Sequence, residues 1–237
     1  MRQKVRIILP TYNERSNIEA LIPKIFAVFK KNKINGDILV IDDNSPDGTA
    51  EFVKILSKKY PIKMLKREKK LGLGSAYIIG FKESLKDKKD IIFEMDSDFS
   101  HDPKYIPKFI KKINSGFDVV IGEREKVVGW NLYRRLVSWG GNFIGRNLAG
   151  VKVQDLTTGY RAYRGEVLKS INLDKIKSNG YAFQLEILAR VLAKKFKVSS
   201  VSIIFKDRKK SQSKLSKWDM LEFFILSIKI RLGLLND

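Results

Sequence analysis

The stretch VRIILPTYNERSNIEALIPKIFAVF, residues 5–29, decides the fold class. It opens with a short run rich in β-branched residues, Val5–Leu9, which is typical of a buried strand. After a polar turn, apolar residues recur at helical spacing, at Ile18, Leu21, Ile22, Ile25, Phe26 and Phe29. Ser16 and Glu19 form a capping-box pattern at the start of this predicted helix. The next apolar run, Ile38–Ile41, completes a strand–helix–strand unit.

The same alternation of short apolar runs and helical patterns continues through the first half of the chain. Further runs that predict strands lie at residues 62–65, 91–95 and 119–121. Helical patterns lie between them, at residues 49–57, 74–85 and 103–112, with Asp102 and Pro103 as a favourable N-cap and first helical residue. We therefore expect an α/β fold with a Rossmann-like, mostly parallel sheet flanked by helices. Ligands of such a sheet bind at the carboxyl ends of its strands.

The second half of the chain is less regular and ends in an apolar helix. Residues 130–148 and 181–193 are predicted to be helices, and residues 198–205 a strand. A basic segment, residues 194–217, precedes a final helical pattern over Trp218–Leu232. We expect one large domain over residues 1–216 with a C-terminal apolar helix over residues 217–237.

Composition narrows the classes of partner and chemistry. The 237 residues include 47 Lys and Arg against 26 Asp and Glu, a formal net charge of +21, and an apolar content of 43% that is sufficient for a packed core. The absence of cysteine excludes disulfides, Cys-ligated zinc and thiol catalysis, and the single histidine, His101, excludes a multi-histidine metal site. The charge predicts an anionic partner, which could be nucleic acid, a lipid headgroup surface or a phosphorylated small molecule.

Neither a targeting signal nor a membrane span is predicted. The N-terminal apolar run is too short for the core of a signal peptide. The longest apolar helix, Trp218–Leu232, is interrupted by charged residues and spans about 22 Å, short of the roughly 30 Å of a bilayer core. We expect a cytosolic protein that lies at a membrane surface as a peripheral protein.

Three polar loops follow predicted strands, at the place where an α/β sheet binds its ligands. They are Pro10–Glu14, Asp42–Thr49 and Asp96–Pro103. Each by itself is also an ordinary turn with a helix cap, because Asp, Asn, Ser, Pro and Gly are common turn residues. Carboxylates gathered at one sheet edge, however, repel one another unless a cation or a polar ligand lies between them.

Asp96 and Asp98 are the best candidates for holding such a cation. Two carboxylates in an extended segment after a buried strand can face one hard ion, Mg²⁺ or Mn²⁺, which could neutralise a diphosphate leaving group. The segment Gly72–Gly74 lacks the third glycine of a dinucleotide-binding fingerprint, so binding of NAD or FAD is disfavoured. His101 is left open between a functional and a structural role.

Seven motifs stand in an order that carries a family resemblance. They are Pro10–Glu14, Asp42–Thr49, Asp96–Pro103, Gly122–Arg124, Thr157–Arg161, Gly180–Glu186, and the segments Asp207-Arg208 and Ser213-Lys214-Leu215 taken together. Over residues 5–216 the chain resembles the GT-A-fold glycosyltransferases of family 2, and specifically the dolichol-phosphate mannosyltransferases. The earlier motifs are shared by many family 2 enzymes, whereas the last two are more specific.

The resemblance implies transfer of mannose from GDP-mannose to a polyprenyl (dolichyl) monophosphate at the cytoplasmic face of a membrane, with Mg²⁺ or Mn²⁺. It assigns the guanosine to Pro10, Tyr12, Glu14, Ile41 and Asp43. It assigns the diphosphate and the metal to Asp96, Ser97 and Asp98, with Ser100 completing the metal shell. It implies that Arg124, Arg208 and Lys214 contact the donor phosphates, and that Arg134 and Ser138 bind the lipid phosphate. The implied catalytic residues are Asp98, Arg124 and Arg134, in a catalytic domain over residues 1–216.

The chain departs from the family pattern in several places. Ser100 stands where some relatives have Gln, Ser211 replaces a glycine, and the loop between Arg124 and Trp130 looks short. Many relatives carry C-terminal membrane spans, which this sequence does not show.

A phosphate monoester acceptor is consistent with the lack of an obvious catalytic base. Its second pKa is about 6, so it is largely dianionic at neutral pH and can attack without a general base. In-line attack would invert an α-linked donor to a β-linked product. The alternatives are a glucosyltransferase that uses UDP-glucose on the same acceptor and, in another class, a basic nucleic-acid-binding protein. Because no nucleic-acid-binding motif is present, we expect no nucleic-acid partner.

Two helices carry the remaining predictions about partners. Arg134, Ser138 and Asn142 are spaced i, i+4, i+8, so they share one face of the 130–148 helix, which could lie in a lipid interface or pack on the sheet. The C-terminal helix is apolar around most of its circumference. It needs burial at a membrane interface, in a homodimer, against a small membrane-anchoring subunit or inside the protein. The remaining Lys-rich surface is expected to face anionic lipid headgroups.

Overall fold

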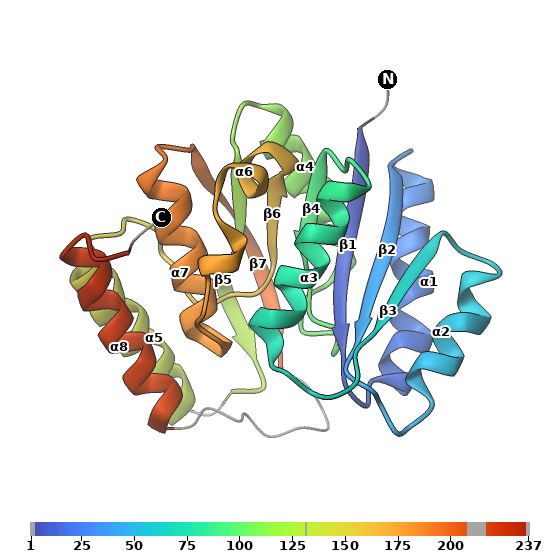
Figure 1. Cartoon of the computed structure of the whole chain (residues 1–237), viewed down its shortest axis with the longest axis horizontal. Coiled ribbons are helices and arrows are strands. Elements are labelled where there is room, and N and C mark those ends of the chain that lie inside the picture. Colours follow the sequence, from blue (N-terminus) through green and yellow to red (C-terminus); the bar gives the residue numbers. More distant parts are fainter. Residues whose placement is uncertain (1–2, 131, 208–216, 236–237) are drawn as a thin grey trace.

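The computed structural model describes residues 3–130, 132–207 and 217–235, except for the side chains of Tyr133, Arg134, Lys217 and Asp219. One seven-stranded sheet has the strand order β3-β2-β1-β4-β6-β5-β7 (Figure 1). The strands are β1 (Lys4–Thr11), β2 (Asn35–Asp42), β3 (Ile62–Lys66), β4 (Ile91–Glu94), β5 (Val119–Val128), β6 (Arg161–Arg164) and β7 (Val198–Lys206). Every pairing is parallel except those of β6, which runs antiparallel to β4 and β5. The predicted mostly parallel sheet is confirmed.

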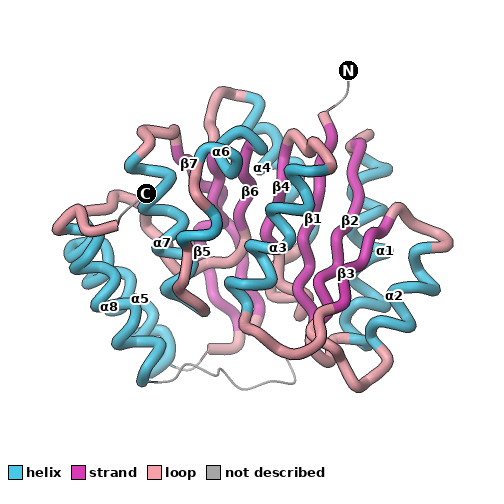
Figure 2. The backbone as a smooth tube through the Cα atoms, in the orientation of Figure 1, coloured by secondary structure: helices cyan, strands magenta, loops and turns pink. Residues whose placement is uncertain are grey.

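Helices cover both faces of this sheet, as Figures 1 and 2 show. They are α1 (Arg15–Lys31), α2 (Thr49–Ser57), α3 (Leu73–Lys86), α4 (Ile106–Asn114), α5 (Leu132–Ala149), α6 (Gly165–Ser170), α7 (Gly180–Ala193) and α8 (Lys217–Arg231), with short 3-10 helices η1 (Pro103–Tyr105) and η2 (Leu173–Lys175). Side chains of α1, α2 and α4 form the core on one face, and those of α3, α6 and α7 form the core on the other. Helices α5 and α8 add to the second core at the end of the sheet that carries α7.

The apolar strands supply both cores because successive side chains point to opposite faces of a sheet. In β1, Ile7 and Leu9 enter the core beneath α1, whereas Ile8 enters the core beneath α3. In β2, Val40 enters the same core as Ile7, and Ile41 enters the same core as Ile8. A continuous apolar run is therefore what a parallel strand covered on both faces requires.

Locally, the structure contradicts one prediction, adds a strand that was not predicted and confirms a helix cap. The capping box at Ser16 and Glu19 is wrong, because α1 begins at Arg15 with Glu14 as its N-cap, and the Glu14 carbonyl already accepts the first helical bond from the Ile18 amide. Strand β6 was not predicted, because its sequence RAYR offers only two apolar residues between two arginines. The predicted cap at Asp102 is confirmed, since its carboxylate accepts a hydrogen bond from the Lys104 amide at 3.0 Å.

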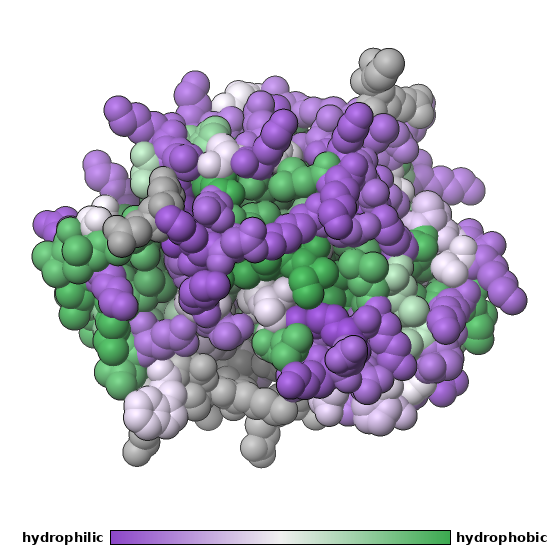
Figure 3. Space-filling view, viewed as in Figure 1, coloured by the Kyte–Doolittle hydropathy of each residue, from purple (hydrophilic) through white to green (hydrophobic). Residues whose placement is uncertain are grey.

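The C-terminal helix α8 packs against both α5 and α7. Phe223 and Leu226 are buried in the shared core, and Gly145 of α5 lies so close to the Phe223 ring that a Cβ there would fall 2.5 Å from it. The opposite surface of the α5–α8 pair is apolar and exposed, as Figure 3 shows over α8. Among the described residues, no helix combines the length and apolarity needed to cross a bilayer.

Replacing Phe223 with Ala should lower the free energy of unfolding by about 3–5 kcal/mol, because it opens a cavity between α8 and α5. The matched change is Ile228→Ala on the exposed side of the same helix, for which we expect a loss below about 1 kcal/mol. Urea denaturation followed by circular dichroism measures both. Equal losses in the two variants would show that α8 is not part of the packed core.

Candidate active site

The ends of β1 and β2 are joined by a buried network centred on Asp42. Its Oδ1 accepts hydrogen bonds from Thr11 Oγ1 at 2.8 Å and Ser45 Oγ at 2.6 Å, and its Oδ2 accepts from the Ser45 amide at 3.0 Å. The side chain of Asp42 is fully buried. Asp42 is therefore a structural residue that holds two of the polar loops together.

The neighbouring carboxylate, Asp43, is held by an arginine that the sequence interpretation missed. Arg67, in the loop after β3, donates from Nε to Asp43 Oδ1 at 2.5 Å. The same guanidinium donates to Ser75 Oγ at 2.6 Å and to the Gly72 carbonyl at 3.2 Å, so it links the start of α3 to Asp43. Nothing in the local sequence distinguished Arg67 from the basic residues around it, because its role depends on the pairing of β3 with β2.

The other residues expected at the nucleotide lie around the same strand ends. Tyr12 is exposed, with Lys70 Nζ 4.2 Å from the centre of its ring. Pro10 pairs with Ile41 across β1 and β2. The side chain of Ile41 is fully buried in the core, so it supports this region from below instead of facing the edge.

The loop after β4 is fixed in place by short hydrogen bonds. Ser97 Oγ donates to the Pro10 carbonyl at 2.7 Å, which ties this loop to the end of β1. Asp98 Oδ1 accepts from the Ser100 amide at 3.0 Å, across Phe99, whose φ of 65° turns the chain. Ser100 Oγ is buried and has no hydrogen-bond partner among the described residues. An oxygen atom in that state fits a ligand that brings its own positive charge or donor.

Asp96 is anchored from below by two aromatic side chains. The Tyr77 hydroxyl donates to Asp96 Oδ1 at 3.3 Å, and His101 Nδ1 accepts a hydrogen bond from the Asp96 amide at 3.0 Å. His101 is fully buried and stacks on Tyr160 with ring centres 4.9 Å apart. Burial lowers the pKa of His101, although Asp96 and Asp98 act in the opposite direction. His101 is therefore a neutral structural residue, which resolves the alternative left open by the sequence.

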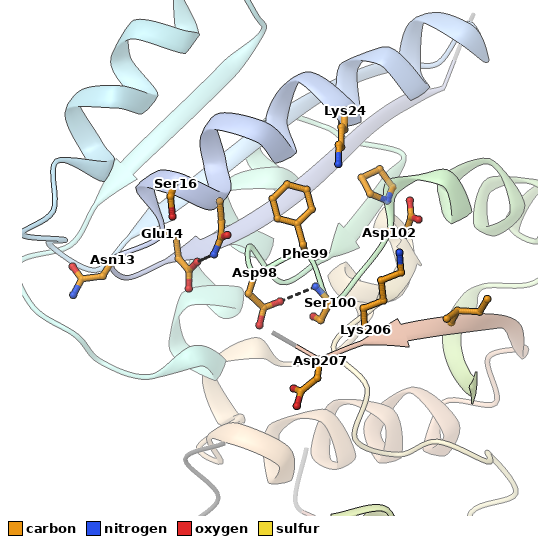
Figure 4. A pocket seen from close by; sticks show the side chains of 13 residues that line it. Asn13, Glu14, Ser16, Lys24, Asp98, Phe99, Ser100, Asp102, Lys206 and Asp207 are labelled. Atoms are coloured by element: carbon orange, nitrogen blue, oxygen red, sulfur yellow. Dashed lines mark hydrogen bonds between the residues drawn. The ribbon is translucent and has the colours of Figure 1, made fainter. Parts of the chain in front are cut away.

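A cavity of about 670 Å³ opens beside this loop (Figure 4). Three residues expected at the site line it, Glu14, Asp98 and Ser100. Glu14 accepts a hydrogen bond from Asn17 Nδ2 at 2.6 Å, and Asp207 approaches from the end of β7. The lining thus gathers carboxylates from three separate elements at the carboxyl edge of the sheet.

Arg124 lies on β5 and is held by a carboxylate that was not predicted. It donates to Asp155 from Nε at 2.5 Å and from Nη2 at 2.7 Å, and Nη2 also donates to Thr157 Oγ1 at 2.6 Å. The guanidinium lies over the Trp130 ring, 5.3 Å from its centre. Burial lowers the pKa of Arg124, but Asp155 outweighs it and leaves the pKa raised. Asp155 stands two residues before the Thr157–Arg161 motif, and only that proximity could have indicated it.

A second cavity, of about 440 Å³, separates β5 from α5. It is lined by Arg124 and Ser138, to which the family resemblance assigned the two phosphates, and by Asn142, which lies on the same helix face as Ser138. Asn142 Oδ1 accepts from the Leu156 amide at 2.8 Å, so α5 is tied to the segment that holds Arg124. The side chain of Arg134, and all of Arg208 and Lys214, lie outside the described residues.

The oxygen atoms of Asp96, Asp98 and Ser100 are the candidates for holding a metal ion. No group of three or more His, Cys, Asp or Glu side chains in the described part of the chain is arranged to hold one. Mg²⁺ and Mn²⁺ are commonly bound by one or two carboxylates, with the remaining positions taken by water and substrate phosphates. The donor set therefore fits an ion that is completed by its substrate.

Comparison with known proteins gives consistent results. The model of "Glycosyl transferase family 2" matches residues 6–171. The chain is 38% identical to an undecaprenyl-phosphate mannosyltransferase of Micrococcus luteus, over 90% of this chain and 88% of that protein. It is 40% identical to a dolichol-phosphate mannosyltransferase of Pyrococcus furiosus, over 93% of this chain and 61% of that protein. A polyprenol monophosphomannose synthase of Mycolicibacterium smegmatis is 36% identical, over 90% of this chain and 82% of its own length.

Among solved structures, the fold matches glucosyl-3-phosphoglycerate synthase from Mycobacterium tuberculosis. That crystal structure, in complex with Mn²⁺, uridine diphosphate and phosphoglyceric acid, has a TM-score of 0.72 and 18% identity, over 98% of this chain and 79% of that chain. At this identity the likeness shows the fold alone, and it confirms the GT-A architecture expected from the sequence.

The burial of His101 leads to a prediction about its pKa, which can be measured directly because the chain has only one histidine. We expect its pKa to lie below the 6.5 of a free histidine, because the buried ring accepts a hydrogen bond at Nδ1. The native state then disfavours protonation, so stability is lost as the pH falls from 6.5 through the folded pKa. NMR titration of the one histidine Cε1–H signal, with the urea-unfolded chain as reference, measures the shift. A folded midpoint at or above the unfolded one would contradict this placement.

Proposed function

The chain belongs to glycosyl transferase family 2, and we propose that it transfers mannose from GDP-mannose to a polyprenyl monophosphate. The observation that carries the proposal is the position of the Asp96–Ser100 loop, which lies against the end of β1 in a chain 36–40% identical to relatives named as polyprenyl-phosphate mannosyltransferases or synthases. Three features support the transfer of a sugar from a nucleotide diphosphate: an anchored carboxylate pair with a cavity beside it, an arginine oriented by a carboxylate, and a second cavity that this arginine lines.

The nucleoside of the donor would lie over the ends of β1 and β2. Asp43 is positioned there by Arg67, and Tyr12 offers an exposed ring for stacking. We keep Pro10 and Glu14 as contacts of the nucleoside, and Ile41 as its support from beneath. A carboxylate suits guanine in particular, because the base presents two adjacent N–H donors.

Asp96 and Asp98, with Ser97 between them and Ser100 beside them, would hold the donor diphosphate through Mg²⁺ or Mn²⁺. A divalent ion bound there supplies positive charge that stabilises the departing diphosphate. The buried Ser100 Oγ, which has no hydrogen-bond partner in the part of the chain that the structure describes, supports this assignment. Mn²⁺ accompanies the nucleotide in the structurally similar synthase.

Positive side chains would complete the phosphate sites on the other side of the reacting carbon. Arg124 is oriented by Asp155 and Thr157 through Nε and Nη2, so its remaining edge can contact a donor phosphate. Arg208 and Lys214 are proposed to contact the same diphosphate. Ser138, across the second cavity from Arg124, is proposed to bind the lipid phosphate together with Arg134.

This arrangement supports direct displacement without a general base. The acceptor phosphate is largely dianionic at neutral pH and is its own nucleophile. His101 cannot serve as a base, because its Nδ1 is already engaged by the Asp96 amide and its ring is buried. The chain's role is to orient the acceptor and to stabilise the charge that develops on the leaving diphosphate. One in-line step would give a β-linked product.

We further propose that the exposed apolar surface of α5 and α8 rests on the cytoplasmic face of a membrane. Leu132, Leu136, Trp139 and Phe143 of α5, and Trp218, Leu221, Ile225 and Ile228 of α8, are exposed large apolar residues. The net charge of +21 would add attraction to anionic headgroups, at about 1 kcal/mol for each basic residue close to the surface. Ser138 lies on the same helix, so a lipid phosphate could reach the cavity from that surface.

The activity is tested with purified protein, Mg²⁺ or Mn²⁺, a polyprenyl phosphate and labelled GDP-mannose or UDP-glucose. We expect a mannolipid with GDP-mannose only, and loss of about a hundredfold or more of this rate in Asp98→Asn. The matched control is Asp102→Asn in the same cavity, which keeps a good N-cap and should retain activity. Glucolipid formed from UDP-glucose would instead favour the glucosyl alternative, and a rate unchanged in Asp98→Asn would refute the site.

The membrane surface is tested by sedimentation with phosphatidylcholine vesicles, with and without phosphatidylglycerol. Trp139→Ser should weaken binding about tenfold or more, because burial of a large apolar side chain contributes roughly 1.5–3 kcal/mol. Ile55→Ser, an equally exposed position on α2, is the control and should not change binding. If Trp139→Ser leaves vesicle binding intact, or only changes the oligomeric state, this face binds another protein surface and not lipid.

A further inference from the structure

Two of the sequence motifs, Thr157–Arg161 and Gly180–Glu186, meet at a buried polar cluster that the proposed reaction does not use. Arg161, at the start of β6, is fully buried. It donates from Nε to the Thr158 carbonyl at 2.9 Å, from Nη1 to the Gln184 carbonyl at 2.7 Å and from Nη2 to the Leu156 carbonyl at 2.7 Å. One guanidinium thus joins the 154–158 segment, with the sequence QDLTT, to the first turns of α7.

Glu94 on β4 is the cross-strand partner of Arg161, whose positive charge acts to lower the pKa of the Glu94 carboxyl group. Glu94 is also fully buried, and its two oxygens accept hydrogen bonds from Tyr163 Oη at 2.9 Å and Gln184 Nε2 at 2.6 Å. Burial raises the pKa of Glu94 to about 7, against the opposing effects of Arg161, Gln184 and Tyr163. Burial of a guanidinium and a carboxyl group is costly, so neither would be placed here for packing alone.

The cluster lies directly beneath the parts of the site that are proposed to contact phosphate. Leu156 and Thr158, whose carbonyls Arg161 holds, flank Thr157. Thr157 and Asp155 are the side chains that orient Arg124, and the Leu156 amide donates to Asn142 of α5. Whatever fixes the 154–158 segment therefore fixes the direction of Arg124 and the distance of α5 from it.

We propose that Arg161 is a positioning residue for the transfer reaction, which holds the 154–158 segment so that Asp155 and Thr157 present Arg124 to the donor diphosphate. This rests on the proposed function, since it takes Arg124 as a phosphate contact. Arg161 itself touches no substrate. A lysine cannot replace it, because a single ammonium does not reach three carbonyls arranged around a planar fork.

The chain offers a matched control in Arg190 on α7. Arg190 is also buried, and it pairs with Glu186 of the same helix at 2.9 Å, away from the 154–158 segment. Arg161→Lys and Arg190→Lys each retain the charge beside a buried carboxylate. The stability of each variant is measured by thermal unfolding. If both arginines are merely structural, variants of equal stability should lose activity to a similar extent.

The test is a double-mutant cycle on kcat/KM for the donor, with Arg124→Lys, Arg161→Lys and the double variant. We expect Arg161→Lys alone to lower kcat/KM at least about tenfold, with Arg190→Lys close to wild type. In the Arg124→Lys background the further loss from Arg161→Lys should be less than about threefold, because residues that act through one another are not additive. Binding of GDP with Mn²⁺, measured by calorimetry, should weaken in Arg161→Lys and not in Arg190→Lys.

Each other result overturns the proposal. If Arg161→Lys lowers kcat/KM by the same factor in the wild-type and the Arg124→Lys backgrounds, Arg161 does not act through Arg124. If Arg161→Lys and Arg190→Lys lower kcat/KM equally, the loss is a general loss of structure. These results leave the proposed function intact, because the wild-type chain is active in them. A wild-type chain that transfers neither sugar overturns the proposed function and, with it, the role of Arg161.

Discussion

The parallel pairing of β1 with both β2 and β4 is the constraint on which the site depends. Because the three strands run in one direction, the loops that follow them must leave at the same edge of the sheet. The pairing places Thr11 opposite Asp42, where their side chains bond, and brings Ser97 within 2.7 Å of the Pro10 carbonyl. The pairing thus holds several carboxylates close together at this edge, which is a geometry that a cation and a diphosphate can stabilise.

Pairing of buried charges extends that constraint across the sheet. Asp43 forms an ion pair with Arg67, and Arg124 forms one with Asp155, whereas the guanidinium of Arg161 is held by three backbone carbonyls. An unpaired charge at these depths would cost several kcal/mol, so each partner restricts the other to one orientation. These contacts hold the side chains beneath the edge in place, and the orientation of Arg124 on β5 can therefore depend on Arg161 on the neighbouring strand β6.

The sequence was sufficient for the architecture because the apolar runs are long and the helical spacing between them is regular. The features that could not be predicted from the sequence have physical causes. Strand β6 has four residues and begins and ends with an arginine, so periodicity could not reveal it. Ile41, assigned to the nucleotide by resemblance, has its side chain in the core, so its role there stays a prediction of support from beneath. Arg67 and Asp155 complete the site through contacts between segments 24 and 31 residues apart in sequence, which no local pattern encodes. The division of the chain at residue 217 stays a prediction, although α8 packs into the core formed with α5 and α7.

Helix α5 explains how one surface could serve a substrate with a charged head and an apolar tail. One face of α5 turns Ser138 and Asn142 towards the cavity that holds Arg124. Trp139 and Phe143, stacked with ring centres 5.5 Å apart, begin the exposed apolar surface one residue further round the helix. A phosphate at Ser138 and a hydrocarbon chain at Trp139 would then be separated by a single helical step. Asn142 ties α5 to the same segment that orients Arg124, so the apolar surface and the proposed phosphate site are linked through one hydrogen bond. The proposed membrane contact and the proposed chemistry therefore share one helix, and a lipid acceptor would be presented to the donor by the surface that carries it.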